Sequence, residues 1–569
     1  MCRPLWTSQL SPWSADHSRR AMEPRQEPST QPLPSVPAAL GAGTLRDCTT
    51  IAVAALLVAV VLRPFQGTPF IDDWVYSWPV QHLLETHEFL FPELVGNPIA
   101  TQVLWGALFC LPFGFSLTTL RVSTWVLGVL ALCALYLLIR ECGGTRRSAL
   151  MAAAVLGFYP VFFILSPTFM TDVPFLAAML WSALLFVRAL QRRRAALVWL
   201  AAAVCAASVG SRVIGVGVAG AMIATLLFHT GRWGRRIRVW LAPALVGPFA
   251  AWLFVWTRAR VFTSADITLL DNGPQQRLAN FRYASWAFLP SMLVETLLFV
   301  LVLVGISLLP IAVGMVRRAI VRRTAYVLWL FAAAWIIAKR AGLAAWVPFE
   351  PGDIWALREI GATASFVPGW HADPLPWWTA VSAVTVALAS AAILVAAWPR
   401  GALREAEKFL VWTIAAQALF VAVLWLTSDR YGLVFVPLTA ALVLARRPPL
   451  RTGPAVACIA VFAVIALAGA HDHLDYNRAV WSAVADLRAE GVPPREIDGG
   501  YVVNGWLQYL HPDDAYHDAS GRIIVPMVNG FAELTYTVAD RPMPNRAVVE
   551  RYRYIGWLRP GGYIYVLKR

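Results

Sequence analysis

Apolar runs of about 20 residues recur along this chain, and that is the length a helix needs to cross ~30 Å of hydrocarbon. Hydrophobic residues make up 58% of the 569 residues, and charged residues make up 14%. A soluble protein of ordinary composition carries about 25% charge. A membrane β-barrel would show alternating strands of about ten residues instead. The sequence therefore predicts an all-α polytopic membrane protein.

The arginines between the runs predict its topology, because Lys and Arg concentrate in cytoplasmic loops. Arginines before the first run place the N-terminus in the cytoplasm, and later basic loops alternate with acidic or neutral ones. Thirteen spans follow, which leaves the C-terminus extracytoplasmic; they lie at about 49–62, 117–139, 148–166, 173–190, 196–209, 213–229, 239–257, 289–316, 324–338, 377–398, 409–427, 431–445 and 453–470. The net charge of +15 is explained by these loops, which argues against nucleic-acid binding.

One apolar segment, Ile99 to Phe115, can be read in two ways. If it crossed the membrane, the basic loop at 140–147 would lie outside. If it lies on the outer surface as an interfacial helix, every later loop obeys the charge rule. We adopt the second interpretation.

The predicted domains are a disordered cytosolic tail at 1–45, a transmembrane domain at 46–470 and a soluble extracytoplasmic α/β domain at 471–569. Large outer loops are expected at 64–116, 258–288 and 339–376. In the last domain, Val480, Trp481, Val484 and Leu487 form a helical stripe, whereas residues 522–528 and 562–567 resemble strands.

The first outer loop holds two adjacent acids, Asp72 and Asp73. Residues 64–120 contain no Lys or Arg but five acids, which is unusual in so basic a chain. Paired acids at a membrane surface indicate a site that takes a proton or holds a cation. Both acids could equally be solvated loop residues.

Other polar residues are predicted at the same outer boundary: Asn97, Asp172, Arg212, Arg430 and Tyr431. A guanidinium suits the oxygens of a lipid phosphate, and a nearby carboxylate can remove a proton from a hydroxyl nucleophile. The alternatives are that Asp172 caps a helix and that Arg430 reaches the interface from a buried stem. The run His471, Asp472, His473 and Asp475 and the group His511, Asp513, Asp514 and His517 contain metal-ligand types, although wet linkers have the same composition.

With these residues in place, the chain resembles the GT-C glycosyltransferases, within the branch of protein O-mannosyltransferases and lipid A aminoarabinose transferases. Asp72-Asp73 followed by Tyr76 resembles the acidic pair of the family's first loop, and Asn97-Pro98 resembles its Pro-containing loop segment. Residues 166–174, ending in Asp172-Val-Pro, resemble the second acidic motif. Asp429-Arg430-Tyr431 through Pro437 resembles the late Arg-Tyr…Pro motif. Trp377-Trp378-Thr379 lacks the acid of the oligosaccharyltransferase Trp-Trp-Asp motif, which argues against that branch.

The resemblance implies a polyprenyl-phosphate sugar donor, a glycan, lipid or protein acceptor, and hexosyl or pentosyl transfer with inversion at the outer face of the plasma membrane. It implies that Asp72 is the general base and that Asp73 and Asp172 shape the acceptor pocket or hold a divalent cation. Tyr76, Asn97, Arg212, Arg430 and Tyr431 are the substrate-binding candidates, with the two arginines on the donor phosphate. The aminoarabinose transferases have Lys where this chain has Asn97, so lipid A is not implied as the acceptor.

Two other hypotheses compete with an enzyme: a transporter or flippase for a lipid-linked or polar solute, and a non-catalytic scaffold that keeps the fold. Transporters favour charged or broken-helix sites at mid-membrane and internal repeats. The interior of the predicted spans is almost free of charge, with Glu295, near an outer end, as the main exception. This pattern favours a surface enzyme.

Overall fold

The computed structural model describes residues 42–92, 94–228, 240–261, 267–269, 289–315, 323–325, 376–398, 402–423, 429–446, 448–517, 523–525, 534–557 and 561–569. The predicted outer loop 339–376, apart from its last residue, lies outside these ranges. So do nearly all of the predicted span 324–338 and most of the loop 258–288.

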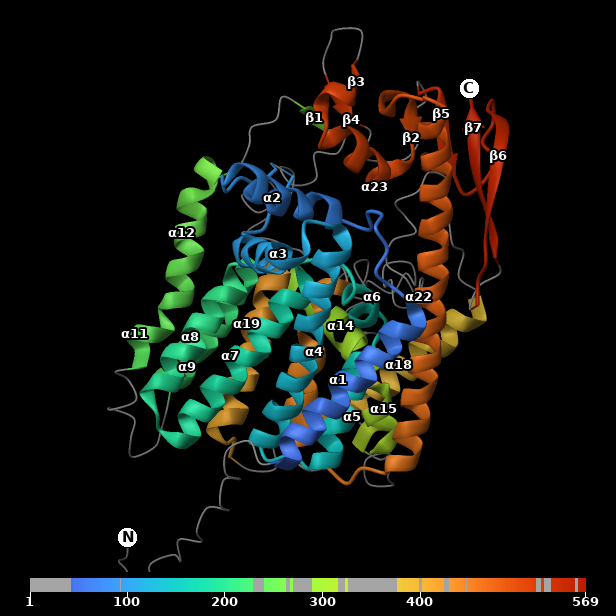
Figure 1. The fold of residues 1–569 in the computed structure, drawn as a ribbon. Coiled ribbons are helices and arrows are strands. Elements are labelled where there is room, and N and C mark those ends of the chain that lie inside the picture. Colours follow the sequence, from blue (N-terminus) through green and yellow to red (C-terminus); the bar gives the residue numbers. More distant parts are fainter. Residues whose placement is uncertain are drawn as a thin grey trace, which may run out of the picture. The chain divides into compact units, whose positions relative to one another are not determined.

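A bundle of apolar helices forms the main body (Figure 1). Its helices are α1 (Ala42–Leu62), α4 (Leu117–Glu141), α5 (Arg146–Gly157), α6 (Pro160–Leu165), α7 (Asp172–Arg192), α8 (Ala195–Val209), α9 (Val216–Leu227), α11 (Leu241–Ala244), α12 (Val246–Val261), α14 (Leu289–Ser307), α15 (Leu309–Gly314), α18 (Pro376–Ala397), α19 (Glu405–Val423), α20 (Asp429–Gly432), α21 (Phe435–Ala445) and α22 (Thr452–Ala489). Within the described residues, every predicted span other than 324–338 overlaps one helix or consecutive helices. The predicted helical membrane architecture is confirmed.

The described residues contain five helices long and apolar enough to cross a membrane, and six shorter apolar ones. Thirteen crossings therefore remain a prediction. The predicted span 148–166 is broken between α5 and α6, where Pro160 begins α6; proline fits the first turn of a helix but cannot continue one.

Two boundaries differ from the sequence prediction. Helix α1 begins at Ala42, inside the predicted tail, and its first turns include the polar residues Arg46 and Asp47. Helix α22 runs for 38 residues through position 470, where the sequence suggested that the last span ended. The helical period simply continues while the composition changes from apolar to mixed.

Helices α2 (Asp73–Thr86) and α3 (Ala100–Phe113) lie across one end of the bundle, transverse to α4 and α7 (Figure 1). We call this the capped end. The transverse placement of α3 agrees with an interfacial helix. The arginines of the basic loops, such as Arg146, Arg188 and Arg404, lie near the other ends of their helices and pair with Asp47, Glu141 and Glu407.

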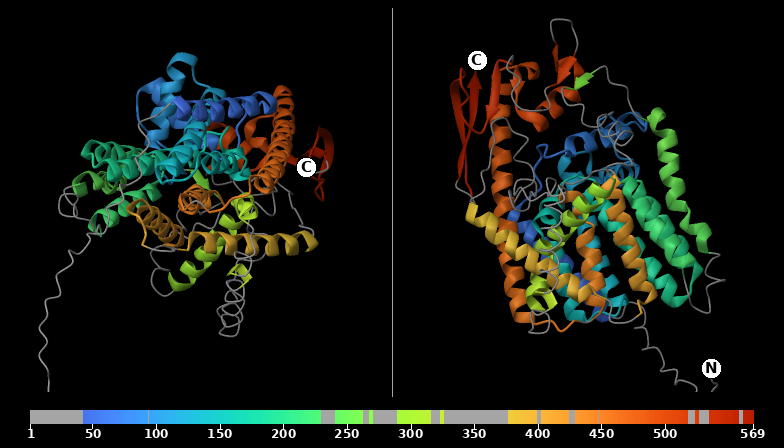
Figure 2. Two further views of the ribbon diagram at one scale, coloured as in Figure 1. Left: turned by 90° about the horizontal axis from the view of Figure 1, so that it is seen from below. Right: turned by 180° about the vertical axis from the view of Figure 1, so that it is seen from behind.

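The C-terminal region adds two small sheets and the helix α23 (Gly500–Asn504), which lie at the capped end in both side views (Figures 1 and 2). The predicted small α/β region is confirmed. One sheet has the order β2-β5-β7-β6, and the other has the order β1-β4-β3. The strands are β1 (Ile267–Leu269), β2 (Ile497–Asp498), β3 (Tyr516–His517), β4 (Ile523–Val525), β5 (Tyr536–Ala539), β6 (Ala547–Tyr554) and β7 (Gly562–Lys568).

The two sheets of the C-terminal region are not built from residues 471–569 alone. Strand β1 comes from the predicted outer loop 258–288 and pairs in parallel with β4. The four-stranded sheet β2-β5-β7-β6 packs against α22. The predicted stripe of α22, Val480, Trp481, Val484 and Leu487, lies in one core with Ile497, Val538 and Val566. Because α22 is one continuous helix, it connects this core directly to the helical bundle.

Candidate active site

Asp72 forms an ion pair with Arg430 at the capped end. It occupies the position before α2, but its side chain makes no capping bond. Instead its Oδ2 accepts from Nη1 of Arg430 at 2.9 Å. The Asp72 side chain is 13% exposed, so it is not a solvated loop acid. Segments 358 residues apart thus meet in one place.

A second acid–arginine pair joins Asp172 to Arg212. Asp172 is the first residue of α7 and Arg212 follows α8. Nη1 of Arg212 lies 2.8 Å from Oδ1 of Asp172, and the side chains are 3% and 1% exposed. Nε of Arg212 donates to the Thr171 hydroxyl at 2.8 Å. Since the position before the helix belongs to Thr171, Asp172 faces Arg212 instead of capping α7 by a side-chain bond.

Tyr431 links the two pairs. The Arg212 guanidinium carbon lies 4.7 Å from the centre of its ring, and that of Arg430 lies 5.3 Å away. Both distances are in the range of cation–π attraction. The structure therefore brings Asp72, Asp172, Arg212, Arg430 and Tyr431 together, and we call this group the acid–arginine cluster.

Two tyrosines face the same cluster. Burial, reinforced by the negative charge of Asp72, raises the pKa of Tyr76. Tyr501, from α23 of the C-terminal region, hydrogen-bonds Asp72, and burial together with Asp72 raises its pKa well above the usual value. A phenol with a raised pKa stays protonated at neutral pH, so Tyr501 donates to the Asp72 carboxylate.

Asp73 lies apart from this group. It is fully buried, and its carboxylate accepts from Nε of Arg121 at 2.9 Å and from Nη2 at 2.6 Å. The Phe70 N–H also donates to it, at 2.6 Å. Arg121 in turn donates to the carbonyls of Thr68, at 2.6 Å, and Gln66. This arrangement holds the first loop on α4, and every oxygen of Asp73 is already engaged.

Asn97 lies near the cluster without joining it. It precedes α3, and the Thr101 N–H of α3 donates to the carbonyl of Gly210 at 3.1 Å. Gly210 is two residues before Arg212, so the loop segment borders the Arg212 turn. No hydrogen bond from the Asn97 side chain is found to the described part of the site.

The run 471–475, which contains metal-ligand types, makes structural contacts. His471 stacks on Trp557 at 3.7 Å, and His473 meets Phe70 edge-on at 4.4 Å. Asp472 and Asp475 accept the backbone N–H groups of Trp557 and Ile555. These residues hold the β6–β7 hairpin on α22. Among the described residues, no group of three or more His, Cys, Asp or Glu side chains is placed to hold a metal ion.

Sequence reasoning missed Arg121 and Tyr501. Arg121 is the first basic residue after the Arg-free stretch and falls inside a predicted span, where an intramembrane charge signals an ionic partner. That signal was present in the sequence. No sequence signal indicated Tyr501, because nothing local connects it with Asp72, which lies 429 positions earlier.

The cluster can bind and transfer protons as well as anions. Its two carboxylates and two guanidiniums balance in charge, and each carboxylate neutralises an arginine that could otherwise hold a phosphate. A carboxylate that can exchange its arginine for a hydroxyl can also accept a proton. Together with the helical bundle, these residues define a multi-pass membrane protein with a cluster of paired acids and arginines at one end of its helices.

The family match agrees with this class. Residues 98–256 match the family described as dolichyl-phosphate-mannose-protein mannosyltransferase. The matched segment contains Asp172 and Arg212, whereas Asp72 and Arg430 lie outside it. The predicted resemblance to the GT-C glycosyltransferases is confirmed over this segment.

Two solved proteins resemble the whole fold weakly. ArnT from Cupriavidus metallidurans is 12% identical in its apo state, with a TM-score of 0.42, 92% of this chain and 98% of that chain covered. Its form bound to undecaprenyl phosphate is 13% identical, with a TM-score of 0.41 and coverages of 93% and 98%.

The archaeal oligosaccharyltransferase AglB from Archaeoglobus fulgidus, in complex with an inhibitory peptide and a dolichol-phosphate, is 16% identical, with a TM-score of 0.43 and coverages of 88% and 70%. A TM-score below 0.5 does not by itself establish a common fold. No curated protein matches the sequence.

Proposed function

We propose that the protein is a glycosyltransferase that moves a sugar from a polyprenyl-phosphate donor to an acceptor hydroxyl at the outer face of the plasma membrane. The observation that carries this proposal is the acid–arginine cluster, in which two ion pairs flank Tyr431. The family match over residues 98–256 supports the donor class. The topology of the basic loops supports the placement of the capped end outside the cell.

Asp72 is the proposed general base. Its carboxylate is held by Arg430 at 2.9 Å and by the Tyr501 hydroxyl, and it is the less buried of the two carboxylates in the cluster. When the donor phosphate attracts Arg430, the Asp72 oxygen becomes available to an acceptor hydroxyl. The hydroxyl proton moves to Asp72 as the acceptor oxygen forms its bond to the anomeric carbon.

Arg430 and Arg212 are the proposed phosphate ligands. The bond between the anomeric carbon and the phosphate oxygen breaks as the new bond forms, so polyprenyl phosphate leaves with one more negative charge. Two guanidiniums directed at that charge stabilise it. A single displacement of this kind inverts the anomeric configuration.

The remaining candidates have positioning roles in this proposal. Asp172 orients Arg212 through the 2.8 Å contact, and Asp73 fixes the loop that carries Asp72 through Arg121. Tyr76 and Tyr431 form walls beside the arginines, and Asn97 borders the Arg212 turn. Asp72, Asp73 and Asp172 are each paired with an arginine, and the proposed reaction is written without a divalent cation.

The test is sugar transfer by the purified protein in lipid nanodiscs, with donor from membranes that lack the protein. Asp72→Asn should lower turnover at least ~100-fold, because it removes the general base, while the variant keeps its Tm. Asp486→Asn is the matched control, since Asp486 lies in the C-terminal region and pairs with Tyr552.

Release of polyprenyl phosphate together with sugar transfer distinguishes the enzyme from a transporter. Movement of intact donor across the bilayer without release would refute the proposed reaction. Equal turnover of Asp72→Asn and the unaltered protein would remove Asp72 from the mechanism.

A further inference from the structure

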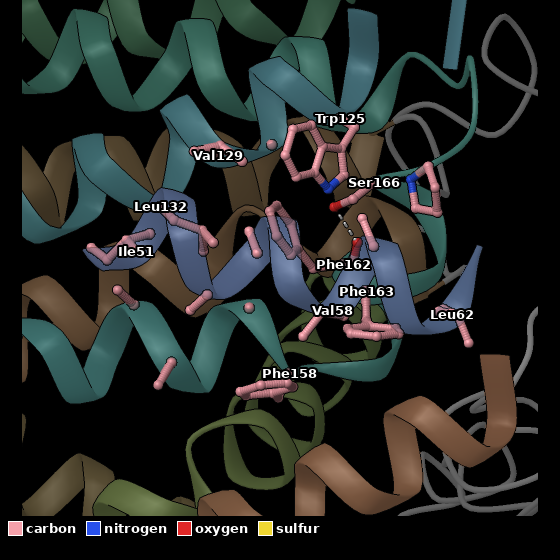
Figure 3. A pocket seen from close by; sticks show the side chains of 18 of the residues that line it. Ile51, Val58, Leu62, Trp125, Val129, Leu132, Phe158, Phe162, Phe163 and Ser166 are labelled. Carbon is pink, nitrogen blue, oxygen red and sulfur yellow. Dashed lines mark hydrogen bonds between the residues drawn. The ribbon is translucent and has the colours of Figure 1, made fainter. Parts of the chain in front are cut away.

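A separate apolar cavity runs along α1, away from the acid–arginine cluster. It has a volume of about 210 Å³ and is enclosed by α1, α4, α5 and α6. Figure 3 shows Val58 and Leu62 of α1 on one side and Leu132, Phe158 and Phe162 on the others. We call it the α1 cavity.

Its walls are almost entirely apolar, and the polar side-chain groups among the lining residues are the Trp125 indole N–H and two hydroxyls. The two hydroxyl groups in its lining are already used, because Thr50 donates to the carbonyl of Arg46 at 2.9 Å and Ser166 donates to that of Phe162 at 2.7 Å (Figure 3). Water needs several polar partners to occupy a cavity. An empty space of this size in a packed bundle also lowers stability. The cavity is therefore suited to a hydrocarbon.

The length of the α1 cavity along α1 matches the length of a lipid chain. The lining of α1 extends from Thr50 to Leu62, which at 1.5 Å per residue is ~18 Å, more than half of the ~30 Å hydrocarbon core. The most apolar window of α1 has a mean hydropathy of 2.0, and only 17% of it is buried by protein. Most of the surface of α1 along the cavity is therefore expected to face lipid.

A basic residue, Arg63, lies next to the lining of the α1 cavity in the sequence. Arg63 is exposed and lies between Leu62 and Pro64, which both line the α1 cavity. It is also the only Lys or Arg between positions 47 and 120. A basic residue at the end of a membrane helix attracts an anionic headgroup.

A small neighbouring cavity keeps this site separate from the cluster. It shares Leu62, Pro64 and Pro167 with the α1 cavity and ends at Arg121, but its volume is only about 10 Å³, too narrow for a chain. Arg121 is itself 2% exposed and committed to Asp73 and to two carbonyls. A lipid chain in the α1 cavity therefore has no internal passage through this neighbouring cavity.

We propose that the α1 cavity binds one acyl chain of an anionic membrane phospholipid, with its headgroup phosphate at Arg63. The chain fills the seam between α1 and the helices α4, α5 and α6. It thereby completes the packing of α1 without taking part in catalysis.

The test uses phosphatidylglycerol that carries a diazirine in one acyl chain, with the full protein in nanodiscs and the adducts mapped by mass spectrometry. Adducts are expected on the cavity segments of α4, α5 and α6. Excess phosphatidylglycerol should compete with them, whereas excess polyprenyl phosphate should not. Competition by polyprenyl phosphate instead would identify the donor's chain as the occupant, and the absence of adducts on these segments would show that no chain enters; either result overturns the proposal.

Three variants sharpen this test. Ala154→Trp fills the cavity from α5 and should abolish the adducts, whereas Val60→Trp, at an α1 residue that is 62% exposed and outside the lining, should keep them. Arg63→Gln should reduce labelling by phosphatidylglycerol about fivefold relative to phosphatidylcholine, the factor expected for one cation near an anionic surface. Equal labelling of the Ala154→Trp and Val60→Trp proteins would show that the probe reacts from the surrounding lipid only.

Discussion

At the scale of single residues, the charged groups of the site bind one another. Arg430 and Tyr501 hydrogen-bond Asp72, and Asp172 holds Arg212. A buried carboxylate without such partners would be costly, and so would a buried guanidinium. The same pairs that stabilise the resting site must open when a phosphate and a hydroxyl enter. The ion pairs are therefore both a structural requirement and a barrier to binding.

Arg430→Ala tests this exchange. Loss of the guanidinium should weaken donor binding roughly ten- to a hundredfold, because a hydrogen bond to a charged group contributes about 1.5–3 kcal/mol. The measurement is the equilibrium binding of a polyprenyl-phosphate sugar to the protein in nanodiscs. Arg478→Ala is the control, since Arg478 is half exposed and pairs with Asp475. Unaltered donor affinity in Arg430→Ala would reject its role as a phosphate ligand.

At the scale of elements, the first loop is fixed by a buried ion pair and not by its own secondary structure. Asp73 is 0% exposed and Arg121 is 2% exposed, and together they hold residues 66–73 against α4. Because Asp72 is the neighbour of Asp73, the position of the proposed base depends on α4. This is why two adjacent acids, identical in type, have separate roles.

Arg121→Met should destabilise the protein by about 3–5 kcal/mol, because it leaves the Asp73 charge buried and unpaired. The double variant Asp73→Leu/Arg121→Met should recover much of that loss, since it removes both charges. Thermal unfolding of the purified variants in detergent measures both effects. If Arg121→Met unfolds at the same temperature as the unaltered protein, the pair does not hold the loop.

The helices show which parts of the structure could be predicted from the sequence. Apolar runs and arginine-rich loops predicted α4, α7 and α8 closely, because hydrophobic length and loop charge are local properties. The continuation of α22 past position 470 was missed, since a helix crossing from lipid to water changes composition without any stop signal. The acid–arginine cluster was predicted by position along the membrane normal. The Arg121 pair with Asp73 was not predicted, because depth alone does not identify which charges touch.

At the scale of the whole molecule, the C-terminal region and the first loop form one structure. Trp481 donates to the carbonyl of Pro69 at 3.0 Å, and Tyr509 accepts from the Leu94 N–H at 3.2 Å. Trp74, fully buried, meets the rings of Tyr501 and Tyr509 edge-on at 5.6 and 5.7 Å. The region therefore supplies Tyr501 to the site and also fixes the loop that carries Asp72. Sequence could not show this, because the partners are separated by more than 400 positions.

Gly505 is the closest point of that contact, because a Cβ there would overlap the indole ring of Trp74. Gly505→Ala should push the segment 500–509 away from α2, withdraw Tyr501 from Asp72 and expose Trp74. We expect faster hydrogen exchange in residues 66–76 and at least ~10-fold slower sugar transfer, since a misplaced catalytic group is costly even at ~1 Å. Gly220→Ala is the matched control, because a Cβ at Gly220 meets no atom within 4 Å. Exchange and transfer unchanged in Gly505→Ala would mean that the C-terminal region does not position the site, while slower transfer with unchanged exchange would place its effect elsewhere than in the first loop.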